Sequence, residues 1–246
     1  MKKLALFVEG LTEQLFALRL LQELAGQHAL AFSILKGAGG RRFDRRWEQV
    51  RLSKQEGAEF FVLLYNCAGD SRVLSDLCEQ YRSLKQAGYE RVLGLTDLYP
   101  EPLSSLERKQ RLIDRHLQAM NVTAKMVIAV MEIEAWFLAE ERHFSRLSPL
   151  LSPEVVSNVL GDVPEKILIE KIEHPSEELH HVYQRACLAY LKRTQQKTSD
   201  KILRTVNAID YENLLCCVTT RVSALDDFCR ELEAFLTKIT GPPQPG

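Results

Sequence analysis

The chain has 246 residues, of which 46% are hydrophobic and 26% charged, and its formal net charge is −1 at pH 7. That length suffices for one large or two small domains with a sizeable core. The near-zero charge excludes a basic surface over the whole molecule, so any contact with nucleic acid has to come from local patches. The six cysteines form no CxxC pair and no zinc spacing, which indicates reduced thiols.

The N-terminal stretch "MKKLALFVEG" reads as a buried strand. Its apolar run ends at Glu9, which is too short for the core of a signal peptide, and no apolar run in the chain reaches ~18 residues. We therefore expect a cytoplasmic protein without contact to a membrane.

Strand and helix patterns alternate through the first 145 residues. Apolar runs predict strands at 3–8, 29–37, 59–67, 91–99 and 124–131. Helical periodicity predicts helices at 12–25, through Trp47 and Val50, at 73–86, at 104–120, and from about 132. Short loops between strand and helix favour an α/β fold with a mostly parallel, doubly wound sheet.

The strand signal fades beyond residue 145, so we predict an α/β domain at 1–145 and a helical C-terminal subdomain at 146–246. The stretch "RLSPLLSPEVVSNVLGDVPEK" reads as two turns bounded by proline. Helices are expected at 176–193, 197–206, 211–217 and 222–239. The isolated His116 and His143 are expected at the surface.

Acidic residues follow three of the predicted strands. Glu9 follows the first, Asp97 follows the apolar part of the fourth, and Glu132 and Glu134 follow the fifth. Each one alone is explained by capping of a helix. Together, at one edge of a parallel sheet, they would repel one another unless a cation neutralised them. Oxygen ligands of this kind suit Mg²⁺ or Mn²⁺.

Three motifs resemble those of a Toprim-like bacterial family of uncharacterised function. "FVEGLTEQLF" resembles the first Toprim motif, and "GLTDLYPEP" and "MEIEAWFLAE" resemble companion motifs of the form D-x-Y-x-x-P and E-x-EAW. The likeness covers most of residues 1–143, and the Lys-rich segment "YLKRTQQKTSDKILRTVNAID" is also similar. Related Toprim proteins include topoisomerases, primases and nucleases of the overcoming-lysogenization-defect type. The resemblance implies that Glu9 is a metal ligand or general acid/base and that Asp97 is a metal ligand.

The chain departs from the usual Toprim D-x-D pair, because Asp97 is followed by Leu98 and Tyr99. Glu132 or Glu134 can supply the missing carboxylate, and we favour Glu134, since Glu132 lies closer to the end of the buried strand. The predicted catalytic residues are therefore Glu9, Asp97 and Glu134. The departure leaves open one-metal chemistry and a degenerate site without catalysis.

The positions of several glycines and basic residues in the sequence indicate contacts with a phosphate-bearing substrate. Gly10 lies in the first motif, and the loop "GAGGRR" offers Gly39, Gly40, Arg41 and Arg42 for close backbone approach and phosphate contacts. A flexible turn followed by a solvated helix explains that loop equally well. Lys201 belongs to a basic segment that either follows a nucleic-acid backbone or faces solvent.

Two functions of different classes follow. The first is a Mg²⁺- or Mn²⁺-dependent phosphodiesterase, specifically a nuclease acting on DNA or RNA, with a role in phage defence. The second is a non-catalytic Toprim-like module that docks on a partner ATPase or on nucleic acid. Nucleotidyl transfer, as in primases, is a third and weaker hypothesis.

Overall fold

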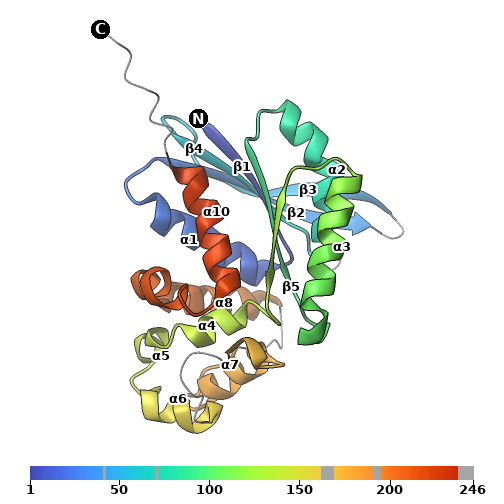
Figure 1. Cartoon of the computed structure of the whole chain (residues 1–246). Helices are drawn as coiled ribbons and strands as arrows, with labels where there is room; N and C mark the ends of the chain where they lie inside the picture. The colour runs from blue at the N-terminus through green and yellow to red at the C-terminus, as the bar shows by residue number, and fades with distance from the viewer. Residues whose placement is uncertain (41–42, 70–71, 162–168, 191–194, 238–246) are drawn as a thin grey trace, which may run out of the picture.

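The computed structural model describes residues 1–40, 43–69, 72–161, 169–190 and 195–237, and their core is a six-stranded sheet (Figure 1). The strands are β1 (Lys2–Val8), β2 (Leu30–Gly40), β3 (Phe43–Leu52), β4 (Phe60–Asn66), β5 (Arg91–Asp97) and β6 (Lys125–Ala129). Their order is β3-β2-β4-β1-β5-β6, and every neighbouring pair is parallel except β2 and β3. The prediction of a mostly parallel α/β sheet is confirmed.

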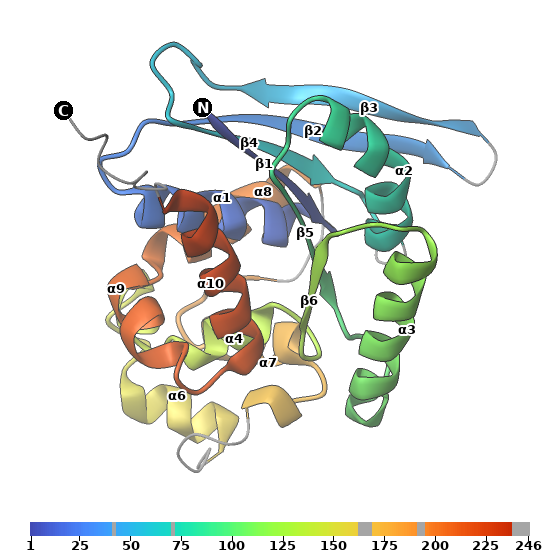
Figure 2. The same cartoon turned by 45° about the horizontal axis from the view of Figure 1, so that its top comes forward.

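Helices cover both faces of this sheet (Figure 2). The first part of the chain contributes α1 (Leu11–Ala25), α2 (Val73–Gln86), the 3₁₀ turn η1 (Leu103–Ser105), α3 (Leu106–Ala119) and α4 (Glu134–Ala139). The rest contributes α5 (Arg142–Leu147), α6 (Pro153–Leu160), η2 (Ile169–Lys171), α7 (Pro175–Gln184), α8 (Gln195–Ala208), α9 (Tyr211–Asn213), the π-helical turn η3 (Leu214–Val218) and α10 (Ser223–Leu236). None of the described helices is both long enough and apolar enough to span a membrane.

Two apolar clusters lie on opposite faces of the sheet. One joins the sheet to α2 and α3, and it includes Leu77 and Ile113. The other joins the sheet to α1, α4 and the C-terminal helices, and it includes Phe16 and Phe228. The ring of Phe235 in α10 lies 5.4 Å from that of Phe60 in β4. The domain boundary at residue 145 stays a prediction, and the second cluster extends across it.

The predicted helix through Trp47 and Val50 is wrong, because this segment is the antiparallel edge strand β3. Trp47 packs edge-on against Tyr65 of β4, with ring centroids 4.7 Å apart, and Arg45 lies over the Trp47 ring. Half-buried Arg45 and Trp47 alternate with exposed Asp44, Arg46 and Glu48, which is the period of a strand. Charged side chains on its exposed positions suit an edge strand.

Within the described part of 146–166, a turn at Pro149 and Leu150 is present as predicted, but the second predicted turn is replaced by the helix α6. Ser152 caps α6, since its side chain accepts a hydrogen bond from the Val155 N–H, and Pro153 occupies the first helical position. This serine-proline pair is a favoured helix start, and the sequence therefore held a signal for α6. The predicted helix 176–193 is shorter, because α7 ends at Gln184.

Candidate metal and phosphate site

The edge of the sheet at which the parallel strands end carries the predicted acidic residues. β1 lies between β4 and β5, and the chain leaves β1 through α1 on one face but leaves β4 through α2 on the other. Open α/β sheets bind ligands at such a switch point, outside the carboxyl ends of the strands. Glu9 follows the last residue of β1, and Asp97 is the last residue of β5.

Glu9 lies against the end of the neighbouring strand and is 7% exposed. One of its carboxylate oxygens accepts a hydrogen bond from the Thr96 hydroxyl. The same oxygen accepts the Asp97 backbone N–H at 3.0 Å. Two donors from β5 therefore hold the Glu9 carboxylate next to Asp97, as the strand-end argument predicts.

Asp97 is fixed by three neighbouring segments. Its carboxylate accepts the backbone N–H of Ile133 at 3.1 Å, and its carbonyl accepts a hydrogen bond from the Lys109 ammonium at 2.7 Å. Burial raises the pKa of Asp97 well above its ordinary value, and the charges of Glu13, Glu9, Glu134 and Glu132 raise it further. The carboxyl of Asp97 thus sits where four other acids disfavour its charge.

Glu13 is the acid to which the sequence analysis assigned no role. It lies in the first turn of α1, is 5% exposed, and accepts the Gly10 backbone N–H at 2.8 Å. Gly10 itself is the N-cap of α1, where a Cβ would lie 3.3 Å from the Glu13 carboxylate. The spacing Glu9-x-x-x-Glu13, which joins the end of a strand to the first turn of a helix, is the sequence signal for this residue. An acid in the first turn of a helix is, however, equally explained by its favourable interaction with the helix dipole.

Glu132 and Glu134 project differently, although they are two residues apart. Glu132 accepts two hydrogen bonds from Ser176, at 2.8 Å from its N–H and 3.2 Å from its hydroxyl, and so caps α7. Glu134 begins α4, is 7% exposed and accepts the Tyr190 hydroxyl at 2.6 Å. Burial and then the charge of Glu13 raise the pKa of Glu134 to about 8, against the opposing hydrogen bond from Tyr190.

We call these five acids the carboxylate cluster: Glu9, Glu13, Asp97, Glu132 and Glu134. Within the described ranges, no three His, Cys, Asp or Glu side chains are already arranged to hold a metal ion. The donor chemistry nevertheless fits Mg²⁺ or Mn²⁺, because all donors are carboxylate oxygens and their mutual repulsion favours a bound cation. Cation binding would require several of these side chains to turn toward a common point.

Of the predicted phosphate-binding residues, Gly10 lies within this cluster, where its N–H donates to Glu13, whereas Gly39 and Gly40 lie apart from it. Gly39 and Gly40 lie at the tip of the β2–β3 hairpin, which is two strand spacings (~10 Å) from β1. Lys36 pairs with Asn66, the last residue of β4, at the edge of the sheet that carries the acids. Gly40 therefore lies four residues (~13 Å) past this edge along β2. Arg41 and Arg42 fall outside the described residues. Lys201 is half-buried in α8, the helix that packs on α1.

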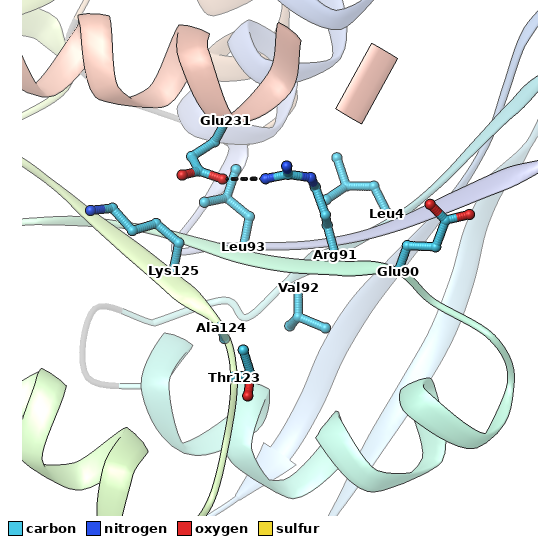
Figure 3. A pocket seen from close by; sticks show the side chains of 9 residues that line it. All are labelled: Leu4, Glu90, Arg91, Val92, Leu93, Thr123, Ala124, Lys125 and Glu231. Atoms are coloured by element: carbon cyan, nitrogen blue, oxygen red, sulfur yellow. Dashed lines mark hydrogen bonds and ion pairs between the residues drawn. The ribbon is translucent and has the colours of Figure 1, made fainter. Parts of the chain in front are cut away.

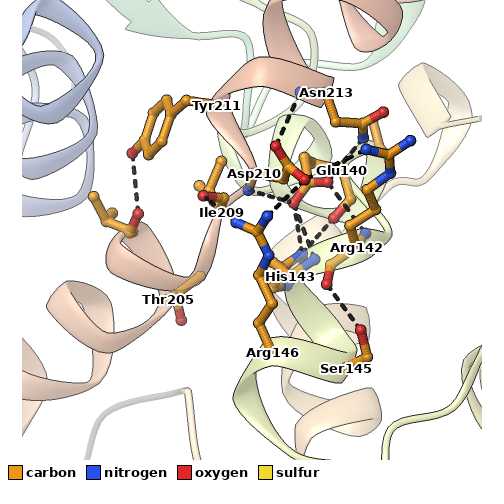
Figure 4. Close-up of polar contacts among 12 residues, drawn as sticks. Glu140, Arg142, His143, Ser145, Arg146, Thr205, Ile209, Asp210, Tyr211 and Asn213 are labelled. Atoms are coloured by element: carbon orange, nitrogen blue, oxygen red, sulfur yellow. Dashed lines mark hydrogen bonds and ion pairs between the residues drawn. The ribbon is translucent and has the colours of Figure 1, made fainter. Parts of the chain in front are cut away.

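A second buried polar network lies among α4, α5 and α9 (Figure 4). Glu140 is fully buried and accepts hydrogen bonds from the backbone N–H groups of Arg142, His143 and Asp210 and from the Asn213 amide. His143, predicted at the surface, is fully buried and lies 2.9 Å from the Tyr183 hydroxyl. Its position in "AEERHF" gave no sign of this burial, which depends on the distant α7.

A cavity of about 470 Å³ opens at the opposite, amino end of β5 and β6 (Figure 3). Its rim holds an ion pair between Arg91 and Glu231, with 2.7 Å between nitrogen and oxygen. None of the carboxylate cluster lines this cavity. The candidate site is therefore the switch-point edge and not this opening.

Comparison with known proteins identifies the family of the chain. A family model described as "Domain of unknown function (DUF4276)" matches residues 8–233. Searches of the curated proteins and of the solved structures returned no match. The family match starts one residue before Glu9 and includes all five acids of the carboxylate cluster. Because the match spans most of its length, the chain belongs to the DUF4276 family.

Proposed function

We propose that this protein is a Mg²⁺- or Mn²⁺-dependent phosphodiesterase, and specifically a nuclease, whose site is the carboxylate cluster. The observation that carries the proposal is the environment of Asp97. Its half-buried carboxyl lies at the switch-point edge among four other acids that raise its pKa. A folded protein retains such a cluster at neutral pH by binding protons or a cation, and a cation at this edge also attracts phosphate.

The residues of the chain have distinct tasks in this proposal. Glu9, Glu13, Asp97 and Glu134 would hold the cation, and Glu132 adds negative charge while it caps α7. A bound Mg²⁺ or Mn²⁺ polarises a phosphate and lowers the pKa of a coordinated water. Thr96 orients the Glu9 carboxylate, which accepts the proton of the attacking water. Lys109 fixes the backbone carbonyl of Asp97 and so positions its side chain.

The resemblance to Toprim motifs supports the same function, since many Toprim proteins transfer phosphoryl groups. The phosphate contacts predicted for Gly10, Gly39, Gly40, Arg41, Arg42 and Lys201 remain proposals. If the nuclease serves phage defence, expression of the chain with its neighbouring genes lowers phage plating, and Asp97→Asn abolishes that protection.

The second candidate function is a non-catalytic module that docks on a partner ATPase or on nucleic acid. Two observations favour it: Leu98 and Tyr99 follow Asp97 in place of a second Asp, and the described acids do not form a ready set of three ligands. Such a module would bind a cation or nucleotide without hydrolysis.

Incubation of the purified protein with single- and double-stranded DNA and RNA separates the two functions. We expect cleavage with Mn²⁺ or Mg²⁺, none with EDTA, and a loss of at least ~100-fold in Glu9→Gln and Asp97→Asn. Glu107→Gln is the matched control, because Glu107 is an exposed acid of α3 that pairs with Arg111. Cleavage that survives both site variants would overturn the proposal. Mn²⁺ binding without cleavage would favour the module.

A further inference from the structure

A pocket of about 260 Å³ adjoins the carboxylate cluster on the face of the sheet covered by α2 and α3. Apolar side chains form most of its lining, among them Val73, Ile113 and Met126. Its polar side chains include Thr96 and Lys109. An apolar pocket with a few convergent polar groups is the usual form of a small-molecule subsite.

Two of the lining residues also belong to the carboxylate site. The Thr96 hydroxyl donates to Glu9, and the Lys109 ammonium donates to the carbonyl of Asp97 at 2.7 Å. Thr96 therefore connects the pocket to the Glu9 carboxylate, and Lys109 connects it to the backbone of Asp97. The ammonium of Lys109 also lies 3.5 Å from the Glu101 carboxylate, which is a hydrogen-bond acceptor at the same wall.

Tyr99 forms the rim of the pocket between these features. Tyr99 is 40% exposed. Its ring packs edge-on against the ring of the exposed His174, with ring centroids 5.7 Å apart. The Tyr99 N–H donates to the Met131 carbonyl at 2.8 Å, which ties this loop to the end of β6. An exposed aromatic ring thus lies at the rim of the pocket, on a backbone segment that is tied to the end of β6.

We propose that this pocket receives one unpaired base of a single-stranded nucleic acid, stacked on Tyr99, whose adjoining phosphate faces the carboxylate cluster. The inference rests on the proposed function and names its substrate class. The pocket can hold one base, whereas a base inside a duplex must first leave the stack to enter it. Stacking on an aromatic side chain is tolerant of sequence because every base has a π-face. The substrate is therefore unpaired at the cleaved position.

The test measures, by fluorescence anisotropy, how tightly the protein binds a fluorescent oligonucleotide of about 12 nucleotides. The oligonucleotide is either single-stranded or annealed to its complement, and Ca²⁺ replaces Mn²⁺ in the buffer. We expect the full chain to bind the single strand more tightly than the duplex. Tyr99→Ala should weaken single-strand binding roughly 10-fold, while Tyr99→Phe keeps it, because the ring and not the hydroxyl stacks.

Leu74→Trp fills the pocket from its half-buried rim and should weaken binding to a similar extent. The matched control is Leu112→Ala, since Leu112 is a 56% exposed side chain of α3 that does not line the pocket. Thermal melts establish that each variant is folded, and Tyr99→Ala, which alters a surface ring, remains informative if Leu74→Trp is unstable.

Equal affinity for duplex and single strand, or single-strand binding unchanged in Tyr99→Ala, would overturn the inference. A hydrolysis assay with Mn²⁺ on the same oligonucleotides separates this result from the proposed function. Cleavage that is indifferent to Tyr99 would leave the phosphodiesterase standing without the base pocket. Binding that depends on Tyr99 without any cleavage would support the base pocket and contradict the proposed phosphodiesterase activity.

Discussion

The backbone N–H of Asp97 donates a hydrogen bond to the side chain of Glu9 at 3.0 Å. This contact joins the ends of β1 and β5, which lie next to each other in the sheet although 88 residues separate the two acids. It makes the position of Glu9 depend on the backbone of the neighbouring strand. Since both side chains also serve the one proposed cation site, substitutions of Glu9 and Asp97 should not be additive.

Removal of the hydroxyl that holds Glu9 should impair the site without altering its charge. Thr96 is 4% exposed, so Thr96→Val leaves the shape of the buried side chain nearly unchanged but removes the donor to Glu9. We expect about 10-fold weaker Mn²⁺ affinity, measured by titration calorimetry, because a hydrogen bond to a charged group contributes ~1.5–3 kcal/mol. Thr96→Ser retains the donor and should bind Mn²⁺ normally. Equal affinities in Thr96→Val and the unaltered protein would contradict this role.

A divalent cation should stabilise the folded protein through the carboxylate cluster. At a Mn²⁺ concentration of ~100 times Kd, linkage adds ~2.7 kcal/mol to the free energy of unfolding, which corresponds to a Tm increase of roughly 5–10 °C. Glu13→Gln should reduce this increase, since Glu13 is one of the charges that act on Asp97 and Glu134. Differential scanning fluorimetry measures the shift, with Glu107→Gln as the control. The same Tm increase in Glu13→Gln would exclude Glu13 from the site.

The buried acid Glu140 should be needed for folding stability. Its two oxygens accept four hydrogen bonds from α5 and the α8–α9 region. Glu140→Gln places an amide donor against these N–H groups, and we expect the free energy of unfolding to fall by about 3 kcal/mol. The control is the neighbouring exposed acid Glu141, because Glu141→Gln should change the free energy of unfolding by less than ~0.5 kcal/mol. Urea unfolding that shows no difference between the two variants would contradict the assignment.

His143 should make folding stability depend on pH. Burial lowers the pKa of His143 to about 4, whereas an unfolded His titrates near ~6.5. The folded state therefore requires the neutral ring, and its stability falls as the pH falls from ~6.5 through about 4. The loss approaches roughly 3 kcal/mol. The groups that face the ring are Glu140, whose carboxylate lies 3.7 Å away, and the Tyr183 hydroxyl.

Urea unfolding between pH 4 and 7 measures this dependence. His143→Gln should be less stable at pH 7 than the unaltered protein, because it loses ring packing against Phe144. Its stability should nevertheless change less across the interval, because the titrating group is gone. Parallel pH profiles for the two proteins would show that other groups control acid unfolding.

Much of the fold follows from local patterns in the chain. The helix predicted at 73–86 is α2, with the same bounds, because the periodicity of its side chains is a local signal. β3 was mistaken for a helix because its inward side chains, Arg45 and Trp47, are kept there by partners on other elements. Arg45 forms a buried ion pair with Asp76 of α2, and nothing near residue 45 in the sequence indicates that partner.

The candidate site, too, could be predicted from the sequence only in part. Glu9 and Asp97 could be brought together from sequence because parallel strands place their carboxyl ends at one edge. The distinction between Glu132 and Glu134 could not be derived fully, since it depends on Ser176 in α7 and on Tyr190 in the segment after α7. Such pairings come from tertiary packing, for which a single sequence carries no periodic signal.

The hydrogen bond from Tyr190 to Glu134 has a consequence for the biosynthesis of the protein. The acids at the edge come from segments around residues 9–13, 97 and 132–134, but the hydroxyl that completes their surroundings arrives only with residue 190. A chain emerging from the ribosome therefore lacks a finished site until residue 190 has been made. No N-terminal fragment that ends before residue 190 carries the whole arrangement, so the site matures only after the segment that follows α7 has been added.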